Sequence, residues 1–171
     1  KKYYKYNAKT YYKIAKNGRA KKLSAVETLA AIRLKKCGGN LKKAFNWSSS
    51  VRYAGNYKVA KKNAANYAKY GFQTGRGDCY VQAATFYQMA KVAGYDAKYV
   101  KGSVKKGKGL APHAWVEIKS NGKTYVYDPN SRVNLARRVT PDTRSLMDRR
   151  VPFSMLKQAK ADKRSQERLE S

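Results

Sequence analysis

Three side chains in this sequence could together carry out chemistry at a carbonyl group. Cys79 directly precedes an apolar stretch with helical periodicity, His113 is the only histidine, and Asp128 ends a short alternating run. A thiol, an imidazole and a carboxylate, in this order along the chain, are the components of acyl transfer through a thioester. Each also has an ordinary structural explanation, because such residues commonly fill cores or shape turns. The elements that would position them therefore decide between the two interpretations.

The expected place of Cys79 is the first turn of a helix. Unpaired backbone N–H groups and the helix dipole favour negative charge at that end, and a neighbouring imidazolium would favour the thiolate further. The adjacent Asp78 opposes both effects unless its carboxylate points away or caps the helix N-terminus.

A hairpin would bring His113 and Asp128 together. Asn-Gly at positions 121–122 is typical of a two-residue loop, which pairs Ser120 with Lys123. In that register His113 and Asp128 share a face as diagonal neighbours, roughly 7–8 Å apart at Cα. The carboxylate would then fix the tautomer of the imidazole and stabilise its charged form. The same face carries Trp115, Glu117 and Val126, and the more apolar face carries Ala114, Val116, Ile118, Tyr125 and Tyr127.

Helical periodicity and capping signals predict the elements before this hairpin. The expected helices lie at about residues 24–36, 41–53, 59–69 and 79–94. Ser24 and Glu27 have the spacing of a capping box for the first helix. The last helix is expected to be central, because apolar residues cover most of its circumference.

The remaining segments are predicted from composition and from period-two alternation. Residues 1–22, rich in Lys and Tyr, are expected to form a turn or two of helix and some extended chain. The alternation predicts short strands at 98–101, 113–119 and 124–127. Gly and Lys residues predict a loop at 102–112, before His113. After Pro129, a charged helix could follow at 154–169.

The chain is strongly basic, with 39 Lys and Arg against 10 Asp and Glu and a formal net charge of +29. Such a surface attracts polyanions, which include nucleic acid, an anionic cell envelope and acidic proteins. The sequence has no zinc-finger, RNA-recognition or helix-turn-helix signature, so no specific nucleic-acid recognition is predicted. It also has no apolar run long enough to span a bilayer and no visible signal peptide, although a mature fragment of a secreted protein would look the same.

Two cysteines are too few for a disulfide scaffold in 171 residues. A bridge between Cys37 and Cys79 would block the candidate nucleophile, and Cys37 is expected to be a small buried or half-buried residue. A zinc site from Cys37, Cys79, His113 and Asp128 is conceivable, but the short-spaced ligand pairs of structural zinc are absent. Neither a metal nor an organic cofactor is predicted.

Several blocks of the sequence resemble the core of the bacterial transglutaminase-like superfamily. The resemblance covers about residues 41–130, and the blocks are 44–53, 75–84, 94–100, 113–117 and 121–129. It implies a papain-like α+β fold, in which a central helix carrying the cysteine packs on a small antiparallel sheet carrying the histidine and aspartate, with extra N-terminal helices. It further implies Cys79 as nucleophile, His113 as general base and acid, and Asp128 as the orienting carboxylate.

The resemblance is incomplete around the nucleophile. Animal transamidating members have Gln-Cys-Trp, whereas this chain has Asp78-Cys79-Tyr80, so the aromatic support is altered. Gln73 lies six residues upstream of the cysteine, where papain-like enzymes place a glutamine that binds the oxyanion. Gln73 as oxyanion donor and Trp115 as an aromatic support are therefore candidates, with an ordinary loop role for Gln73 as the alternative; the backbone N–H of Cys79 is another oxyanion donor.

One domain in three parts is predicted: a helical extension at 1–40, a catalytic core at 41–130 and a basic extension at 131–171. The expected activity is acyl transfer or hydrolysis at amide bonds of peptides or glutaminyl side chains. The alternative is a non-catalytic module of the same fold that binds anionic surfaces, such as a cell-envelope polymer.

The predicted partner is a protein or peptide substrate, for which acidic character is plausible because lysines crowd the loop before His113. These lysines are Lys105, Lys106 and Lys108. The Lys/Tyr-rich composition resembles extracellular pieces of bacterial surface proteins, which favours secretion or the cell surface; a cytoplasmic location fits the composition as well.

Overall fold

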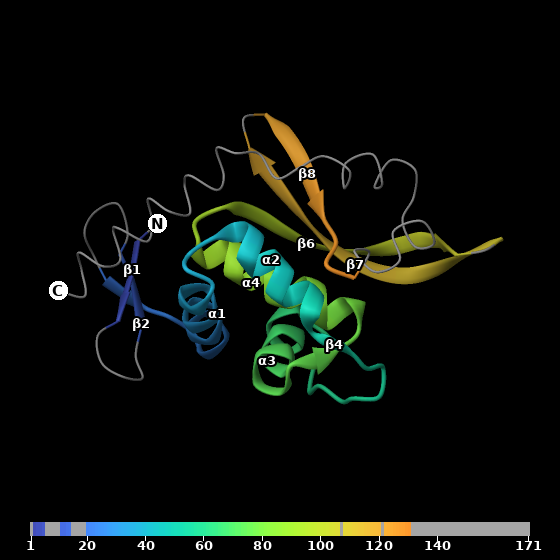
Figure 1. Ribbon diagram of the computed structural model, residues 1–171, viewed down its shortest axis with the longest axis horizontal. Helices are drawn as coiled ribbons and strands as arrows, with labels where there is room; N and C mark the ends of the chain where they lie inside the picture. Colours follow the sequence, from blue (N-terminus) through green and yellow to red (C-terminus); the bar gives the residue numbers. More distant parts are fainter. Residues whose placement is uncertain (1, 6–10, 15–19, 107, 121, 131–171) are drawn as a thin grey trace.

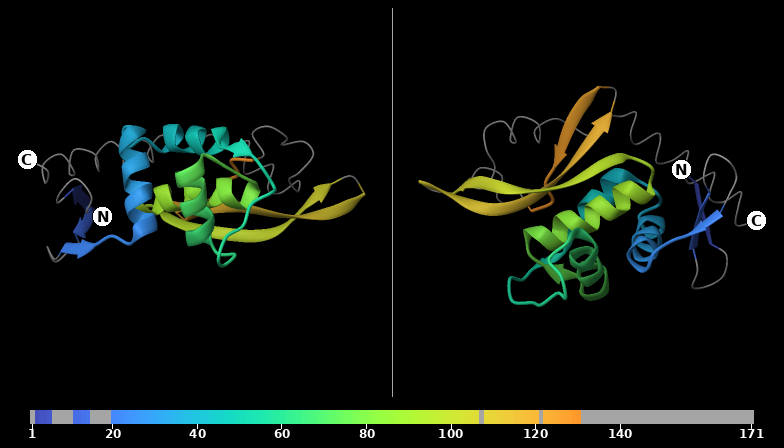
Figure 2. Two further views of the ribbon diagram at one scale, coloured as in Figure 1. Left: turned by 90° about the horizontal axis from the view of Figure 1, so that it is seen from below. Right: turned by 180° about the vertical axis from the view of Figure 1, so that it is seen from behind.

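The computed structural model describes residues 2–5, 11–14, 20–106, 108–120 and 122–130, and a helix expected at 154–169 lies outside them. Its described helices pack around one central helix, α4, whose other side carries a three-stranded sheet (Figure 1). A second small sheet lies at one end of the molecule, and a long β-hairpin extends from the opposite end (Figure 1 and Figure 2). No described helix is long and apolar enough to cross a membrane.

The N-terminal segment forms strands where a turn or two of helix was expected. The three antiparallel strands are β1 (Lys2–Lys5), β2 (Tyr11–Ile14) and β3 (Ala20–Lys22), in the order β1-β2-β3. Tyrosine favours extended chain over helix, and pairing between strands supplies the backbone hydrogen bonds that a short helix would have provided. The helical part of the expectation for this segment was wrong in the described residues, whereas the expected extended chain is present as these strands.

Helix α1 (Ala25–Lys36) begins at the predicted capping box. The Ser24 hydroxyl accepts the Glu27 backbone N–H at 3.3 Å, and the Glu27 carboxylate accepts the Ser24 backbone N–H at 3.1 Å. An N-cap of this kind stabilises a helix by about 1 kcal/mol. The helix ends at Cys37, after which the Gly39 N–H closes back on the Leu34 carbonyl oxygen at 2.9 Å.

The next two helices differ in extent from the prediction. Helix α2 (Leu41–Ser50) ends three residues early, because Arg52–Tyr53 (β4) pairs in parallel with Arg76–Gly77 (β5). Helix α3 (Ala64–Thr74) starts five residues late, because Asn63 caps it: its side chain accepts the Asn66 N–H at 2.9 Å.

Gly71, which was expected to end α3, lies inside that helix. A Cβ at this position would meet the side chains of Val81 and Thr85 at 2.6 Å, so the glycine allows α3 and α4 to approach closely. The helix ends instead at Gly75, which has a φ of 68° in the left-handed region.

Helix α4 (Cys79–Val92) is the buried centre of the fold, as predicted. It contacts α1, α2 and α3 on one side and the sheet on the other. Phe86 and Met89 are fully buried, and the Phe86 ring packs edge-on against Phe45 of α2 at a centroid distance of 5.3 Å. The position of Cys79 is therefore fixed by the most tightly packed element of the molecule.

The main sheet consists of β6 (Asp96–Lys106), β7 (Gly109–Ser120) and β8 (Lys123–Tyr127), antiparallel in that order. The predicted register of the second hairpin is confirmed, since Ser120 pairs with Lys123. Its apolar face is also confirmed: Ala114, Val116 and Ile118 are fully buried in the core that α4 shares with the sheet.

The loop expected at 102–112 was wrong, because β6 and β7 continue as paired strands on either side of residues 107–108. Lys105 and Lys106 therefore belong to a strand, and Lys108 lies in the turn. Gly102, which suggested a loop, pairs with His113. A Cβ there would lie 2.5 Å from the indole of Trp115, so this glycine makes room for the ring. The α+β fold class itself is confirmed.

Candidate active site

Cys79 is the first residue of α4, and it is buried with a free thiol. Asp78 caps this helix: its Oδ1 accepts the backbone N–H groups of Tyr80 at 3.1 Å and Val81 at 3.3 Å. The same oxygen accepts the hydroxyl of Tyr57 at 2.7 Å. Of the two arrangements considered from the sequence for Asp78, the structure has the capping one. Cys37 is likewise a free, buried cysteine, so no bridge blocks the Cys79 sulfur.

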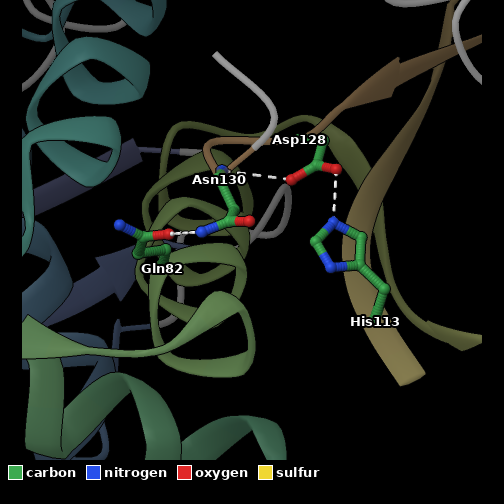
Figure 3. A network of polar contacts seen from close by, with 4 residues as sticks. All are labelled: Gln82, His113, Asp128 and Asn130. Carbon is green, nitrogen blue, oxygen red and sulfur yellow. Dashed lines mark hydrogen bonds and ion pairs between the residues drawn. The ribbon is translucent and has the colours of Figure 1, made fainter. Parts of the chain in front are cut away.

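His113 and Asp128 form a buried pair, as the hairpin register predicted (Figure 3). His113 Nε2 donates to Asp128 Oδ2 at 2.5 Å. Asp128 directly follows the last residue of β8, and its other oxygen, Oδ1, accepts the backbone N–H of Asn130 at 3.1 Å. Both carboxylate oxygens are therefore engaged, one by the imidazole and one by the chain that follows.

The imidazole of His113 lies between Asp128 and Cys79. Burial lowers the pKa of His113, but hydrogen bonds to Asp128 and to Cys79, with the charges of both groups, outweigh burial and raise it to about 9. Since Nε2 is bonded to Asp128, the remaining ring nitrogen, Nδ1, is the one available to sulfur. The arrangement favours a charged imidazolium beside the thiol at neutral pH.

Two residues of this site were missed from the sequence. The Nδ2 of Asn130 donates to Gln82 Oε1 at 2.9 Å (Figure 3). Gln82 Nε2 donates to the Val51 carbonyl oxygen at 2.8 Å. Both side chains are buried. The available signal was Gln82 itself, a polar residue within the apolar run expected to be a central helix; Asn130 carried no signal beyond its place after Asp-Pro.

Tyrosine side chains surround the N-terminal end of α4. The rings of Tyr67 and Tyr80 stack at a centroid distance of 5.5 Å, and the Tyr99 hydroxyl donates to the Tyr80 carbonyl oxygen at 3.0 Å. Burial raises the pKa of Tyr80, and the charges of Cys79 and Asp78 raise it further. The ammonium of Lys101 lies 5.4 Å from the centre of the Tyr67 ring and 5.9 Å from that of Tyr80. A cation therefore lies near this end of the site.

The two candidate supporting residues lie in different places. The Trp115 ring is 6.4 Å from the His113 ring at an interplanar angle of 30°, and its Nε1 donates to Glu117 Oε1 at 3.2 Å. Gln73 is exposed near the end of α3, and no hydrogen bond among the described residues joins it to Cys79 or His113. Among the described residues, no three His, Cys, Asp or Glu side chains are grouped so as to hold a metal ion.

A cysteine at the start of a central helix, packed on an antiparallel sheet with a histidine and aspartate, defines the papain-like α+β class of proteins. The family model of the transglutaminase-like superfamily matches residues 27–129, and the chain belongs to that superfamily. The match takes in most of α1 as well as the segment that resembled the family core.

Among the solved structures with a similar fold is one titled a "putative cysteine protease" from Cytophaga hutchinsonii, with a TM-score of 0.52 and 18% sequence identity. The similarity covers 67% of this chain and 40% of that one, so the chain spans less than half of the solved protein. A sequence identity of 18% supports a similarity of fold alone. None of the curated proteins matches this chain.

Proposed function

We propose that this protein is a thiol enzyme that transfers or hydrolyses acyl groups at amide bonds, with Cys79 as nucleophile, His113 as general acid and base, and Asp128 as the orienting carboxylate. The observation that carries the proposal is the buried His113 ring, which is hydrogen-bonded to the Asp128 carboxylate and whose pKa the neighbouring Cys79 thiol helps to raise. A histidine with a purely structural role has no need of a thiol partner at the start of a central helix.

The geometry suggests how the reaction would proceed. The Cys79 thiolate attacks the amide carbon, and the carbonyl electron pair moves onto oxygen. As this pair returns, the C–N bond breaks and the imidazolium of His113 gives its proton to the leaving amine. The resulting thioester is resolved by water or a second amine, which loses a proton to the neutral imidazole, and the C–S bond breaks to restore the thiolate.

Asp128 acts in this scheme through His113. Its carboxylate holds the ring in the orientation that leaves Nδ1 toward sulfur, and it stabilises the charged ring. For the oxyanion, the backbone N–H of Cys79 is the donor nearest the nucleophile, because it belongs to the first turn of α4. Gln73 and Trp115 remain candidate contributors to oxyanion binding and ring support.

An acidic peptide or protein is the substrate class that we propose. Lys101 lies against the tyrosines that flank Cys79, and its Nζ donates to the Lys62 carbonyl oxygen at 2.7 Å, which fixes a cation there. The chain's net charge of +29 attracts anionic partners over longer range. Such a charge also suits a secreted or cell-surface location.

The test uses a Cys37→Ala background, in which Cys79 is the only thiol. We expect iodoacetamide to alkylate Cys79 readily near neutral pH, and His113→Ala to slow alkylation about tenfold or more because the thiolate loses its imidazolium. The measurement is the rate of mass increase of the intact protein, with Cys79→Ser as the unreactive control. Slow alkylation that is indifferent to His113→Ala would contradict the proposal and favour a non-catalytic module that binds anionic surfaces.

A second arm of the same experiment measures the reaction itself. Glutamine-containing peptides, matched in length but acidic or neutral, are incubated with the protein and an amine, and mass spectrometry detects hydrolysis or amine incorporation. We expect turnover of the acidic peptide to exceed that of the neutral one, and the difference to shrink with added salt. Equal turnover would contradict the acidic substrate class while leaving the thiol chemistry intact.

A further inference from the structure

Gln82 and Asn130 form a pair of buried amides that the proposed mechanism does not use. Gln82 is 3% exposed and Asn130 5%, and they are 48 residues apart in the chain. A buried amide is costly unless its hydrogen-bonding groups find partners. Here Gln82 both accepts from Asn130 and donates to the Val51 carbonyl oxygen, so the pair is kept as a bonded unit (Figure 3).

The bonds of this pair form a continuous chain that ends at the imidazole. It runs from the Val51 carbonyl at the end of α2, through Gln82 of α4, to the Asn130 side chain. The backbone N–H of Asn130 then donates to Asp128 Oδ1, and Asp128 Oδ2 accepts from His113. The Val51 carbonyl can only accept a hydrogen bond, so the Gln82 side chain must present its NH2 group to Val51 and its oxygen to Asn130. Asn130 must in turn present its NH2 group to Gln82.

Cys79 and the segment that contains Asp128 are thereby both attached to α4. Cys79 is the first residue of α4, and Gln82 lies within the first turn of that helix. Asp128 and Asn130 come after the end of β8, so pairing between β7 and β8 no longer holds them in place. The amide pair supplies an attachment of this segment to α4.

We propose that Gln82 and Asn130 are positioning residues, which fix residues 128–130 to α4 so that the Asp128 carboxylate stays directed at His113 and the imidazole stays in register with Cys79. The inference rests on the proposed function, because positioning matters only if the His113 ring works with the thiol. Neither amide is expected to touch substrate, since both are buried and bonded within the protein.

The test follows His113 directly, because it is the only histidine and its ring gives one resonance set by NMR. The titratable groups that face the ring are Asp128, which follows β8, and Cys79 from α4. We compare Gln82→Met, which keeps length but removes the amide, with Gln88→Met. Gln88 is a buried glutamine of the same helix whose Oε1 has no partner among the described residues.

We expect Gln82→Met to lower the pKa of His113 by about 0.5 or more, a threefold or greater change in its protonation equilibrium, and Gln88→Met to leave it unchanged. An unchanged His113 pKa in folded Gln82→Met would overturn the positioning role, whatever the wild-type reactivity.

A second variant keeps the proposal falsifiable if Gln82→Met does not fold. Asn130→Ala removes only the Nδ2 donor and keeps the backbone N–H that bonds to Asp128. We expect it to lower the His113 pKa in the same direction, and an unchanged pKa would again overturn the inference. Failure of the proposed function looks different: wild-type Cys79 would then be unreactive and indifferent to His113→Ala, while the Gln82 effect on the His113 pKa could still be measured.

Discussion

At the level of single residues, the proposed chemistry depends on the charge state of His113. The ring is buried, which disfavours charge, yet the Asp128 carboxylate bonded to it and the neighbouring Cys79 thiol raise its pKa, and the charged form prevails. Its pKa is raised from 6.5 to about 9, so the ring is an imidazolium at neutral pH. A general acid that must protonate a leaving amine is needed in this form.

Asp128→Asn should lower the pKa of His113 from about 9 toward its ordinary 6.5, because a neutral amide no longer stabilises the charge. The limb of the activity profile that falls as pH rises should therefore move from about pH 9 in the wild type toward neutrality in the variant. The measurement is kcat/KM against pH for the acidic peptide. A falling limb that does not move would contradict the role assigned to Asp128.

The same variant has a consequence for folding stability. A folded-state pKa above the unfolded value stabilises the fold fully below pH 6.5, and this contribution is lost as pH rises through about 9. A tenfold difference in proton affinity between the folded and unfolded states corresponds to about 1.4 kcal/mol. Urea unfolding should therefore show a decline in the free energy of unfolding across this pH window, and the decline should be smaller in Asp128→Asn.

At the scale of elements, close approach at glycine positions shapes the site. Gly71 lets α3 pack on α4, and Gly102 lets the Trp115 indole lie across β6 beside His113. The sequence predicted neither role, because a glycine within an element resembles a glycine that ends one. Which of the two roles a glycine has depends on the side chain that packs against it, and in both cases that side chain lies more than nine positions further along the chain. A local sequence pattern contains no information on such a contact.

Gly102→Ala should push the Trp115 ring away from His113, because the new Cβ would lie 2.5 Å from the indole. We expect a loss of about 1–3 kcal/mol in stability from overpacking. Fluorescence in a Trp47→Phe background, where Trp115 is the only tryptophan, reports the displacement. Gly109→Ala is the matched control on β7, since a Cβ there meets no atom of the described residues within 4 Å. Equal effects from the two substitutions would contradict this explanation.

What the sequence predicted well at this scale had a local signal. The Ser24 and Glu27 capping box began α1, and Asn-Gly at 121–122 set the hairpin register that joined His113 to Asp128. The amide pair of Gln82 and Asn130 had no such signal, because its members meet only through the tertiary fold. Capping also explains why α3 starts later than predicted. The Asn63 N-cap determines its first residue, whereas the prediction followed the apolar periodicity.

At the scale of the whole molecule, one helix joins the parts of the site. Helix α4 carries Cys79 at its start and contacts α1, α2, α3, β6 and β7. Through Gln82 it also contacts the segment that carries Asp128, so the proposed nucleophile and the His113–Asp128 pair are attached to the same helix. The strong positive charge of the chain is a separate property, which bears on the choice of partner and not on the arrangement of the site.

The most direct test of the central claim is the NMR titration of His113 before and after Cys79 is blocked by methyl methanethiosulfonate in the Cys37→Ala protein. Blocking removes the contribution of Cys79 that raises the pKa of the ring. We predict that the pKa of His113 falls from about 9 on blocking and returns when the disulfide is reduced. A pKa that is the same with the sulfur free or blocked would show that the thiol and the imidazole do not act together, and would contradict the proposed thiol chemistry.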